Sequence, residues 1–197
     1  MVMYHVCGAE GKHLLEGGLM ASQEIISRIR FLLGDITRIP ADVIVNAANS
    51  ALRGGSGVNG AIHREGGPEI MRELDRIRPH GGLPPGKSVL TGAGTLPARY
   101  VAHTVGPIWG GGNQGETGTL ASAYRETLSL AAGVGARIVT FPSISTGSYG
   151  YPVELAAPVA LTAIASFLQS PSSIEEILFV FSSRHTCRVY EEALRKL

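Results

Sequence analysis

The stretch that decides the fold reads VIVNAANSALRGGSGVNGAIHREGG and spans residues 43–67. It begins with three β-branched apolar residues, which favour a buried strand. Two asparagines follow, then a glycine-rich loop, and then residues 58–64, which have a helical pattern. A strand that passes through a loop of small residues into a helix is typical of layered α/β domains. Glycines in such a loop allow the backbone to approach a ligand closely, and simple turns are the alternative.

The rest of the chain continues this alternation of strands and helices. Strands are predicted at residues 28–33, 43–45, 88–91, 100–104, 137–141 and 177–181. Helices are predicted at residues 58–64, 68–77, 119–132, 153–168 and 186–196. Such alternation predicts an α/β domain with helices on both faces of a mixed sheet, and ligands bind such sheets at the carboxyl ends of the strands.

Two helices carry recognisable boundary signals. Thr117 or Thr119 is the expected N-cap of the helix over 119–132, and Gly133 is its expected stop. Pro158 lies inside the predicted helix over 153–168, where it should kink or loosen the helix because proline lacks a backbone N–H.

Composition indicates one globular domain. The 197 residues include 44% hydrophobic and 17% charged residues with a formal net charge of +1, which gives no electrostatic reason to bind nucleic acid or an anionic membrane. Cys7 and Cys187 are too few and too far apart for a zinc site or a disulfide scaffold, so a reducing cytoplasm is expected. We take residues 1–24 as an N-terminal leader that lacks the apolar core of a signal peptide, and residues 25–197 as the domain.

Residues 81–88, GGLPPGKS, match the phosphate-loop pattern but lie in the wrong context. A phosphate loop follows a strand and precedes a helix, which lets backbone N–H groups face the phosphates. Here a predicted helix comes before and a predicted strand after, and Pro84 and Pro85 have no N–H to offer. A turn between helix and strand is the better interpretation.

Three segments together indicate a site for a nucleotide-sugar diphosphate. Asp35 follows one strand and can accept a hydrogen bond from an exocyclic amine, while Asn46 and Asn49 follow the next strand and can bind ribose hydroxyls. Two loops of small residues, before residue 58 and at 143–150, each lead into a helix and can cradle a diphosphate with backbone N–H groups. The alternative for Asp35 is a turn closed with Thr37, and the alternative for the two amides is a role in holding the loop backbone.

The combination of motifs resembles the macrodomain family, in particular its MacroD-type branch. The resemblance covers about residues 28–196. It is carried by five motifs in the family's order: GDIT at 34–37, VNAAN at 45–49, GGSGVNGAIHREGGP at 54–68, HTVGPIW at 103–109 and STGSYGYP at 145–152.

This resemblance implies a three-layer α/β/α fold with a mixed central sheet that binds ADP-ribose without a metal or cofactor. It implies hydrolysis of esters at the distal ribose, both in O-acetyl-ADP-ribose and in mono-ADP-ribose attached to acidic side chains of proteins. By resemblance, Asp35 and Ile36 hold the adenine, Asn49 faces the distal ribose, and Tyr149 packs against that ribose. The residues that wrap the diphosphate are Gly57, Val58, Ser145, Thr146, Gly147, Ser148 and Tyr149.

The chain departs from the family pattern at the centre of its catalytic loop. The family commonly has aspartate where this chain has Asn59, and an amide cannot serve as a general base near neutral pH. Loss of a general base typically lowers the rate by about 10²–10⁴-fold. Asn59 can still orient a water, His63 lies one helical turn further on and either assists or only packs, and the diphosphate of the substrate can itself act on the water. Asn59 is a natural residue, an engineered one or, in an Asn-Gly pair, one that deamidates.

A second departure concerns the adenine. Many relatives place an aromatic residue just after the last strand, and Phe181 is the candidate here. If the register is one residue later, Ser182 occupies that position and the adenine contact is weaker.

Two functions are therefore in question. The first is an ADP-ribosyl ester hydrolase whose catalytic candidates are Asn49, Asn59 and His63. The second is a non-catalytic module that reads ADP-ribose.

Overall fold

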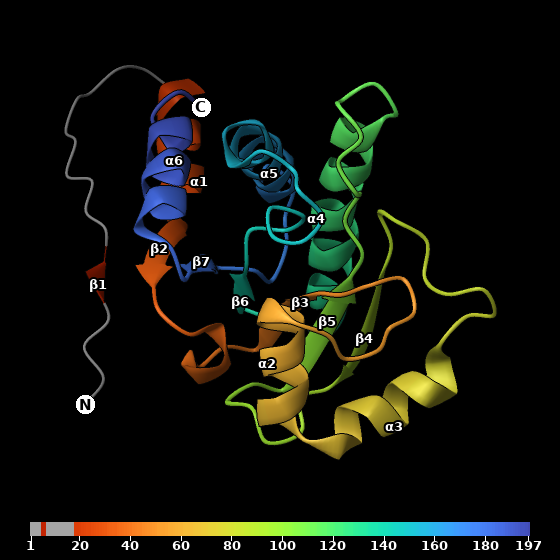
Figure 1. Ribbon diagram of the computed structural model, residues 1–197. Coiled ribbons are helices and arrows are strands. Elements are labelled where there is room, and N and C mark those ends of the chain that lie inside the picture. The colour runs from red at the N-terminus through yellow and green to blue at the C-terminus, as the bar shows by residue number, and fades with distance from the viewer. Residues whose placement is uncertain (1–4, 7–17) are drawn as a thin grey trace.

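The computed structural model describes residues 5–6 and 18–197 (Figure 1). Its strands are β1 (His5–Val6), β2 (Ile29–Leu33), β3 (Val43–Ala47), β4 (Ser88–Gly92), β5 (Tyr100–Thr104), β6 (Ile138–Phe141) and β7 (Glu176–Phe181). Its helices are α1 (Gly18–Ser27), α2 (Gly57–Gly66), α3 (Pro68–Ile77), α4 (Glu116–Gly133), α5 (Val153–Leu168) and α6 (Arg184–Leu194), with a 3₁₀ turn η1 (Ile36–Arg38) after β2. The proposed division of the chain at residue 24 stays a prediction, and that residue lies within α1.

The strands form one mixed sheet in the order β1-β2-β7-β6-β3-β5-β4. Five neighbouring strands pair in parallel, namely β2, β7, β6, β3 and β5. The edge strands β1 and β4 pair antiparallel with their neighbours. Parallel strands must be joined by crossovers, which the helices supply. The predicted mixed sheet is confirmed.

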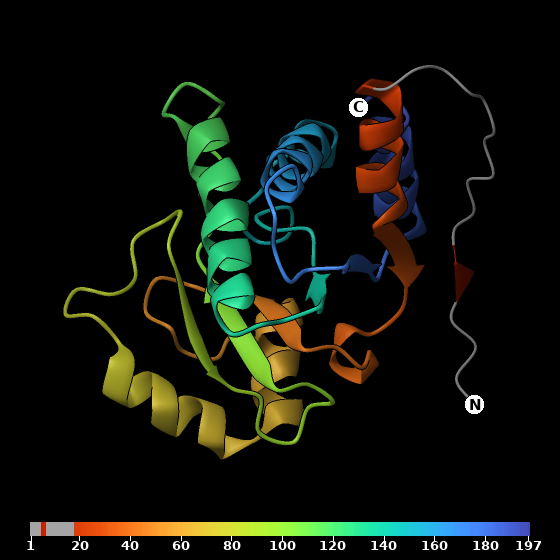
Figure 2. The ribbon, with the colours of Figure 1, turned by 180° about the vertical axis from the view of Figure 1, so that it is seen from behind.

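Helices cover both faces of the sheet, so the fold has three layers. Side chains of α4, α5 and α6 pack on one face and form a first core, which contains most of the aromatic rings. Side chains of η1, α2 and α3 pack on the other face, in a second and mainly aliphatic core. The two groups of helices stand on opposite sides of the sheet in Figure 1 and in the reverse view of Figure 2. The expected α/β/α architecture is therefore confirmed.

The last strand shows why runs of consecutive apolar residues occur in these strands. In β7, Phe179 and Phe181 point into the first core, while Leu178 and Val180 point into the second. Because successive side chains of a strand alternate between the two faces, a strand that is covered on both faces is favoured to carry apolar residues at consecutive positions.

The predicted N-cap of α4 was wrong. The helix begins at Glu116, and its N-cap is Gly115 in the left-handed conformation, rather than Thr117 or Thr119. The Glu116 carboxylate accepts hydrogen bonds from the backbone N–H groups of Gly110 (3.0 Å), Gly112 (3.0 Å) and Gln114 (2.6 Å). The backbone N–H of Glu116 and those three groups lower the pKa of this carboxyl. A buried carboxylate thus orders the loop before α4, which a search for threonine caps overlooks.

Pro158 has a smaller effect than expected. Helix α5 continues through Pro158 from Val153 to Leu168 as one element. The missing N–H removes one hydrogen bond within the helix, while the small residues around it pack into the first core. Within the described part of the chain, no helix has the length and apolar character needed to cross a membrane.

At the amino ends of two central strands, Asp42 joins the strands through its side chain. Its carboxylate accepts hydrogen bonds from the backbone N–H groups of Arg137 (2.8 Å) and Ile138 (3.0 Å). The hydrogen bond from Ile138 lowers the pKa of Asp42 most, burial opposes it, and the N–H of Arg137 and the charges of Arg99 and Arg137 lower it further.

We expect Asp42→Ala to lower the free energy of unfolding by about 1–3 kcal/mol, because two backbone N–H groups lose a charged acceptor. A carboxyl whose pKa is lowered by folding stabilises the protein above its unfolded pKa and loses that effect as the pH falls. The difference between the variant and the parent should therefore shrink below about pH 4, as measured by urea denaturation. Identical unfolding midpoints at pH 7 would contradict this role.

Candidate functional site

A cavity of about 750 Å³ opens at the carboxyl ends of the parallel strands. Its walls come from the segments that follow β2, β3, β6 and β7 and from the first turn of α2. Because these strands are parallel, segments far apart in the sequence meet at one edge of the sheet. Twelve of the fourteen predicted site residues line the cavity: Asp35, Ile36, Asn49, Gly57, Val58, Asn59, Ser145, Thr146, Gly147, Ser148, Tyr149 and Phe181.

Asp35 lies at the end of the cavity beside β2. Its Oδ1 accepts hydrogen bonds from the Thr37 amide (2.9 Å) and hydroxyl (2.7 Å), and its Oδ2 lies 3.6 Å from Arg38 Nε. Burial raises the pKa of Asp35, but the contacts with Thr37 and Arg38 outweigh it and lower the pKa overall. The turn with Thr37 is therefore formed, and it holds an ionised carboxylate at the cavity wall.

Phe181 contributes little accessible surface to this end of the cavity. Its side chain is 2% exposed, and its ring packs against Phe31, Phe179 and Tyr190 in the first core. Ser182 and Thr186 line the cavity beside it. The structure thus puts hydroxyl groups next to a ring that the core already covers on most sides.

The first turn of α2 offers unused backbone donors to the cavity. Ser56 is the N-cap of α2, and its side chain makes no capping hydrogen bond. The N–H groups at a helix N-terminus have no partner within the helix and attract anions. Gly60 allows the preceding loop to lie on the helix, because a Cβ there would be 2.2 Å from the Gly55 carbonyl oxygen.

The facing wall is the loop after β6. Ser145 adopts a left-handed conformation with φ of 67°, which is uncommon outside glycine, and its Oγ is buried without a hydrogen-bond partner in the protein. A Cβ at Gly106 would lie 2.1 Å from that Oγ, so glycine is required beside it. The backbone N–H of Trp109 donates to the Tyr149 carbonyl oxygen (2.8 Å), which joins this loop to the segment after β5.

The amide of Asn59 is held on both sides by the protein. Its Oδ1 accepts from Asn46 Nδ2 (2.9 Å), and its Nδ2 donates to the Arg53 carbonyl oxygen (3.0 Å). Asn49 Nδ2 donates to the same carbonyl oxygen (2.9 Å), and Asn49 Oδ1 accepts from the Arg53 N–H (3.1 Å). Both amides thus hold the loop between β3 and α2, as the alternative for Asn49 anticipated, and both also line the cavity.

Asn46 and His63 do not line the cavity. Asn46 is fully buried behind Asn59, and its Nδ2 also contacts His103 Nδ1 (3.1 Å). His63 packs against His103 with ring centroids 5.9 Å apart, and its Nε2 is buried without a partner. Burial lowers the pKa of His63. These positions support the packing interpretation of His63.

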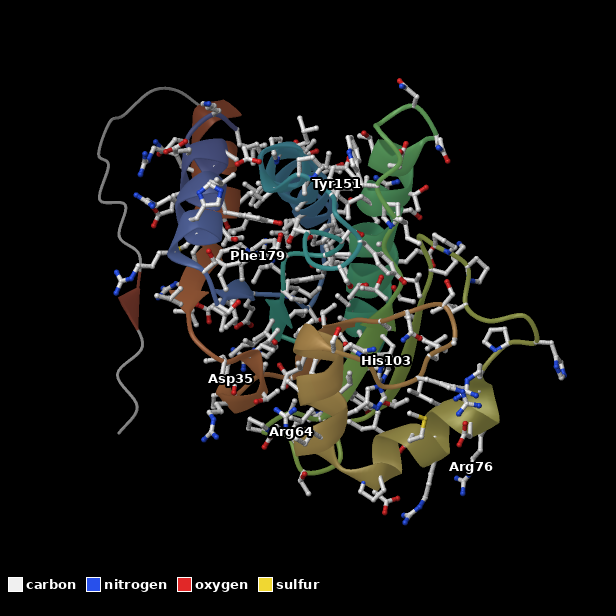
Figure 3. The ribbon with its side chains drawn as sticks, viewed as in Figure 1. Asp35, Arg64, Arg76, His103, Tyr151 and Phe179 are labelled. Atoms are coloured by element: carbon white, nitrogen blue, oxygen red, sulfur yellow. The ribbon has the colours of Figure 1, made fainter. Side chains whose placement is uncertain are left out.

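Sequence reasoning missed His103, which is labelled in Figure 3. It is fully buried on β5, and its Nε2 lies 2.9 Å from Thr91 Oγ1. Burial, followed by the nearby His63, lowers the pKa of His103 to about 3, so the ring is neutral at ordinary pH. Its place in the HTVGPIW motif indicates that His103 is near the site, but no pattern in the sequence indicates which residues it contacts.

The cavity contains few groups that can move a proton. Among its lining residues only Asp35 and Tyr149 have ionisable side chains, and burial raises the pKa of Tyr149. Asp35 follows β2, whereas Asn59 belongs to the segment after β3, and β7 and β6 lie between those strands. None of the lining residues supplies a carboxylate beside Asn59.

We expect Asn59→Asp to destabilise the protein at neutral pH. One carboxylate oxygen would keep the bond from Asn46, but the other would face the Arg53 carbonyl oxygen at the position of Nδ2, which costs about 1–3 kcal/mol. This contact should raise the pKa of the new carboxyl, and the penalty should fade as the pH drops and the carboxyl can donate again. Urea denaturation at pH 7.5 and pH 4.5, with the parent protein as the control, tests this; a penalty that is equal at both values contradicts it.

Comparison with known proteins assigns the fold to a family. The family model described as "Macro domain" matches residues 45–160. A macro domain-containing protein of Caldanaerobacter subterraneus is 52% identical over 171 residues, which cover 86% of this chain and 97% of that protein. A protein of Klebsiella pneumoniae named O-acetyl-ADP-ribose deacetylase is 48% identical over 164 residues, which cover 83% of this chain and 94% of that protein.

Comparison with a solved structure supports the same assignment. The Trypanosoma brucei macrodomain in complex with ADP-ribose superposes with a TM-score of 0.80 at 37% identity, covering 87% of this chain and 71% of that one. The sheet order, the cavity at the carboxyl ends of its parallel strands and these similarities lead to one conclusion: the chain belongs to the macro domain family.

Proposed function

We propose that this protein binds ADP-ribose in the cavity and hydrolyses esters at the distal ribose, with O-acetyl-ADP-ribose as a substrate. The observation that carries the proposal is the cavity itself, in which two loops of small residues face each other between a carboxylate and a pair of amides. Relatives named O-acetyl-ADP-ribose deacetylase and a neighbour solved with ADP-ribose support the choice of ligand.

The chemistry of the walls suggests how the ligand lies. The adenine amine would donate to Asp35, with Ile36 beside the base. The diphosphate would lie between the N-terminus of α2 and the loop around Ser145. It would accept hydrogen bonds from backbone N–H groups of α2 and from the buried Ser145 hydroxyl, which has no partner in the protein. The distal ribose would then reach Asn49, Asn59 and Tyr149.

Hydrolysis proceeds by attack of water on the ester carbonyl carbon. The bond between that carbon and the ribose oxygen breaks, the ribose oxygen takes a proton, and acetate and ADP-ribose leave. Asn59 can donate a hydrogen bond to the water or the ester, but it cannot accept the proton of the water. The diphosphate of the substrate is the alternative group that can position or deprotonate the water, so we expect slow turnover.

The same ester bond links mono-ADP-ribose to acidic side chains of proteins, and we extend the proposal to these substrates. The exposed Gly147 and Ser148 at the wall leave the loop accessible from solvent. The proposal includes a cytoplasmic location and no cofactor.

A second candidate function is a module that reads ADP-ribose without hydrolysing it. The observation that favours it is the position of Asn59, whose oxygen is bound to Asn46 and whose neighbours in the cavity include no carboxylate. Binding needs only the walls of the cavity, whereas hydrolysis needs a route for the proton.

Turnover of O-acetyl-ADP-ribose by the parent protein and by Asn59→Asp separates the two functions. A general base is typically worth about 10²–10⁴ in rate, so we expect a slow parent and an aspartate variant that is faster by at least about 10²-fold above the pKa of the new carboxyl. Calorimetry with ADP-ribose shows whether both proteins bind. Binding with no turnover by either protein supports the reader, and equal, fast turnover by both shows that position 59 does not limit the reaction.

Asp35→Ala should weaken binding of ADP-ribose by about 10-fold or more, because the adenine amine loses a charged acceptor. Thermal unfolding is the control, since Asp35 also closes the turn with Thr37. Asp35→Asn keeps an oxygen for Thr37 and should lose less affinity than Asp35→Ala. Calorimetric affinity that is unchanged in both variants would refute the adenine assignment.

A further inference from the structure

A line of buried polar groups runs from the edge strand β4 to the cavity. Its members are Thr91 on β4, His103 on β5, Asn46 on β3 and Asn59 on α2, and none of them is more than 6% exposed. The successive contacts measure 2.9 Å from Thr91 to His103, 3.1 Å from His103 to Asn46 and 2.9 Å from Asn46 to Asn59. Only Asn59 among the four lines the cavity.

The direction of hydrogen bonding along this line follows from its β4 end. The Thr91 hydroxyl donates to the Gly92 carbonyl oxygen (2.9 Å), which can only accept. The hydroxyl oxygen must therefore accept from His103 Nε2–H, and a neutral ring protonated at Nε2 leaves Nδ1 as an acceptor. Asn46 must then turn its NH₂ group toward His103.

The other end of the line requires the same direction. The Arg53 carbonyl oxygen can only accept, so Asn59 must turn its NH₂ group toward it and its oxygen toward Asn46. Asn46 again has to be the donor. It meets both demands with its two N–H bonds, and its own Oδ1 stays buried without a partner. Two backbone carbonyls thus determine every donor and acceptor between them.

We propose that His103 is a positioning residue for the proposed hydrolysis: as an acceptor for Asn46, it holds the Asn46 NH₂ toward the Asn59 oxygen and so, together with the Arg53 carbonyl oxygen, keeps the Asn59 amide in one orientation, with its oxygen toward the core and its NH₂ toward the Arg53 loop. This inference rests on the proposed function for its effect on turnover. Its effect on the orientation of Asn59 holds with or without turnover.

The arrangement leaves Asn59, which lines the cavity, with one donor that the protein contacts do not use. One N–H of Asn59 binds the Arg53 carbonyl oxygen, and the second N–H is the remaining donor of this side chain, whose oxygen also keeps one lone pair beside the bond from Asn46. A Cβ at Gly55 would lie 3.1 Å from Asn59 Nδ2, so the loop backbone lies directly over that nitrogen. Neutral His103 keeps the direction constant, since protonation at Nδ1 would make it a donor that faces another donor.

Two substitutions of His103 separate this role from simple packing. In His103→Asn the side-chain oxygen can take the place of Nδ1 and accept from Asn46, while the contact with Thr91 is lost. In His103→Gln the amide NH₂ can take the place of Nε2–H and donate to Thr91, while the acceptor for Asn46 is lost. Both variants remove the ring, so a packing role predicts similar behaviour for the two.

The first measurement uses the full-length protein without ligand and does not depend on turnover. The side-chain NH₂ signals of Asn59 in ¹H–¹⁵N spectra, and hydrogen exchange of the backbone amides over 53–59, report how this amide is held. We expect His103→Asn to keep the parent signals and exchange rates, and His103→Gln to shift the signals and speed exchange by at least about 10-fold. Equal changes in both variants, or none in either, would overturn the proposal.

The second measurement is kinetic. With O-acetyl-ADP-ribose, we expect kcat of His103→Gln to fall at least about 10-fold below that of His103→Asn, while the affinities of both for ADP-ribose stay within about 3-fold of the parent. Asp42→Ala, which weakens the opposite end of the sheet, is the control for lost stability and should keep the parent kcat. If the parent shows no turnover, the proposed hydrolysis fails, and the spectra alone decide the role of His103. Equal kcat values for the two His103 variants would overturn it.

Discussion

Parallel pairing of the five inner strands, β2, β7, β6, β3 and β5, is the constraint on which the rest of the structure depends. It directs the carboxyl ends of these strands to one edge, where the segments after β2, β3, β6 and β7 enclose one cavity. It also requires helices on both faces, because strands joined by crossovers are buried on both sides. The apolar residues along β7 satisfy that requirement, and they also draw Phe181 into the core.

Within this frame the chemistry of the cavity depends on how backbone carbonyls are satisfied. The Arg53 carbonyl oxygen accepts from both Asn49 and Asn59. The loop between β3 and α2 is therefore held by the same two side chains that face the proposed ribose. A carboxylate at position 59 would place an oxygen against the Arg53 carbonyl oxygen, where Asn59 now donates a hydrogen bond. The amide of Asn59 therefore holds the loop, and the same amide leaves the cavity without a general base there.

Much of the fold could be predicted from the sequence because local signals agree with the global pattern. Apolar runs marked the central strands, and the motifs around Asp35, Asn49 and Tyr149 marked segments that do meet at the cavity. The prediction of the α4 cap failed because the partner of the helix start is not a threonine but the Glu116 carboxylate, which collects N–H groups from a glycine loop. Asn46, predicted to bind ligand, lies behind Asn59, since it shares the face of β3 with Ile44, which α2 covers.

The sequence by itself determined the alternation of strands and helices, the places where glycine lets the backbone come close, and the absence of an acid at position 59. Only the tertiary structure decided which way the amides point and which residues they bind. The reason is physical: propensity and periodicity act between neighbours in the chain, whereas the direction of a buried hydrogen bond is set by its partner. Here that partner comes from 57 positions away, where His103 on β5 meets Asn46 on β3.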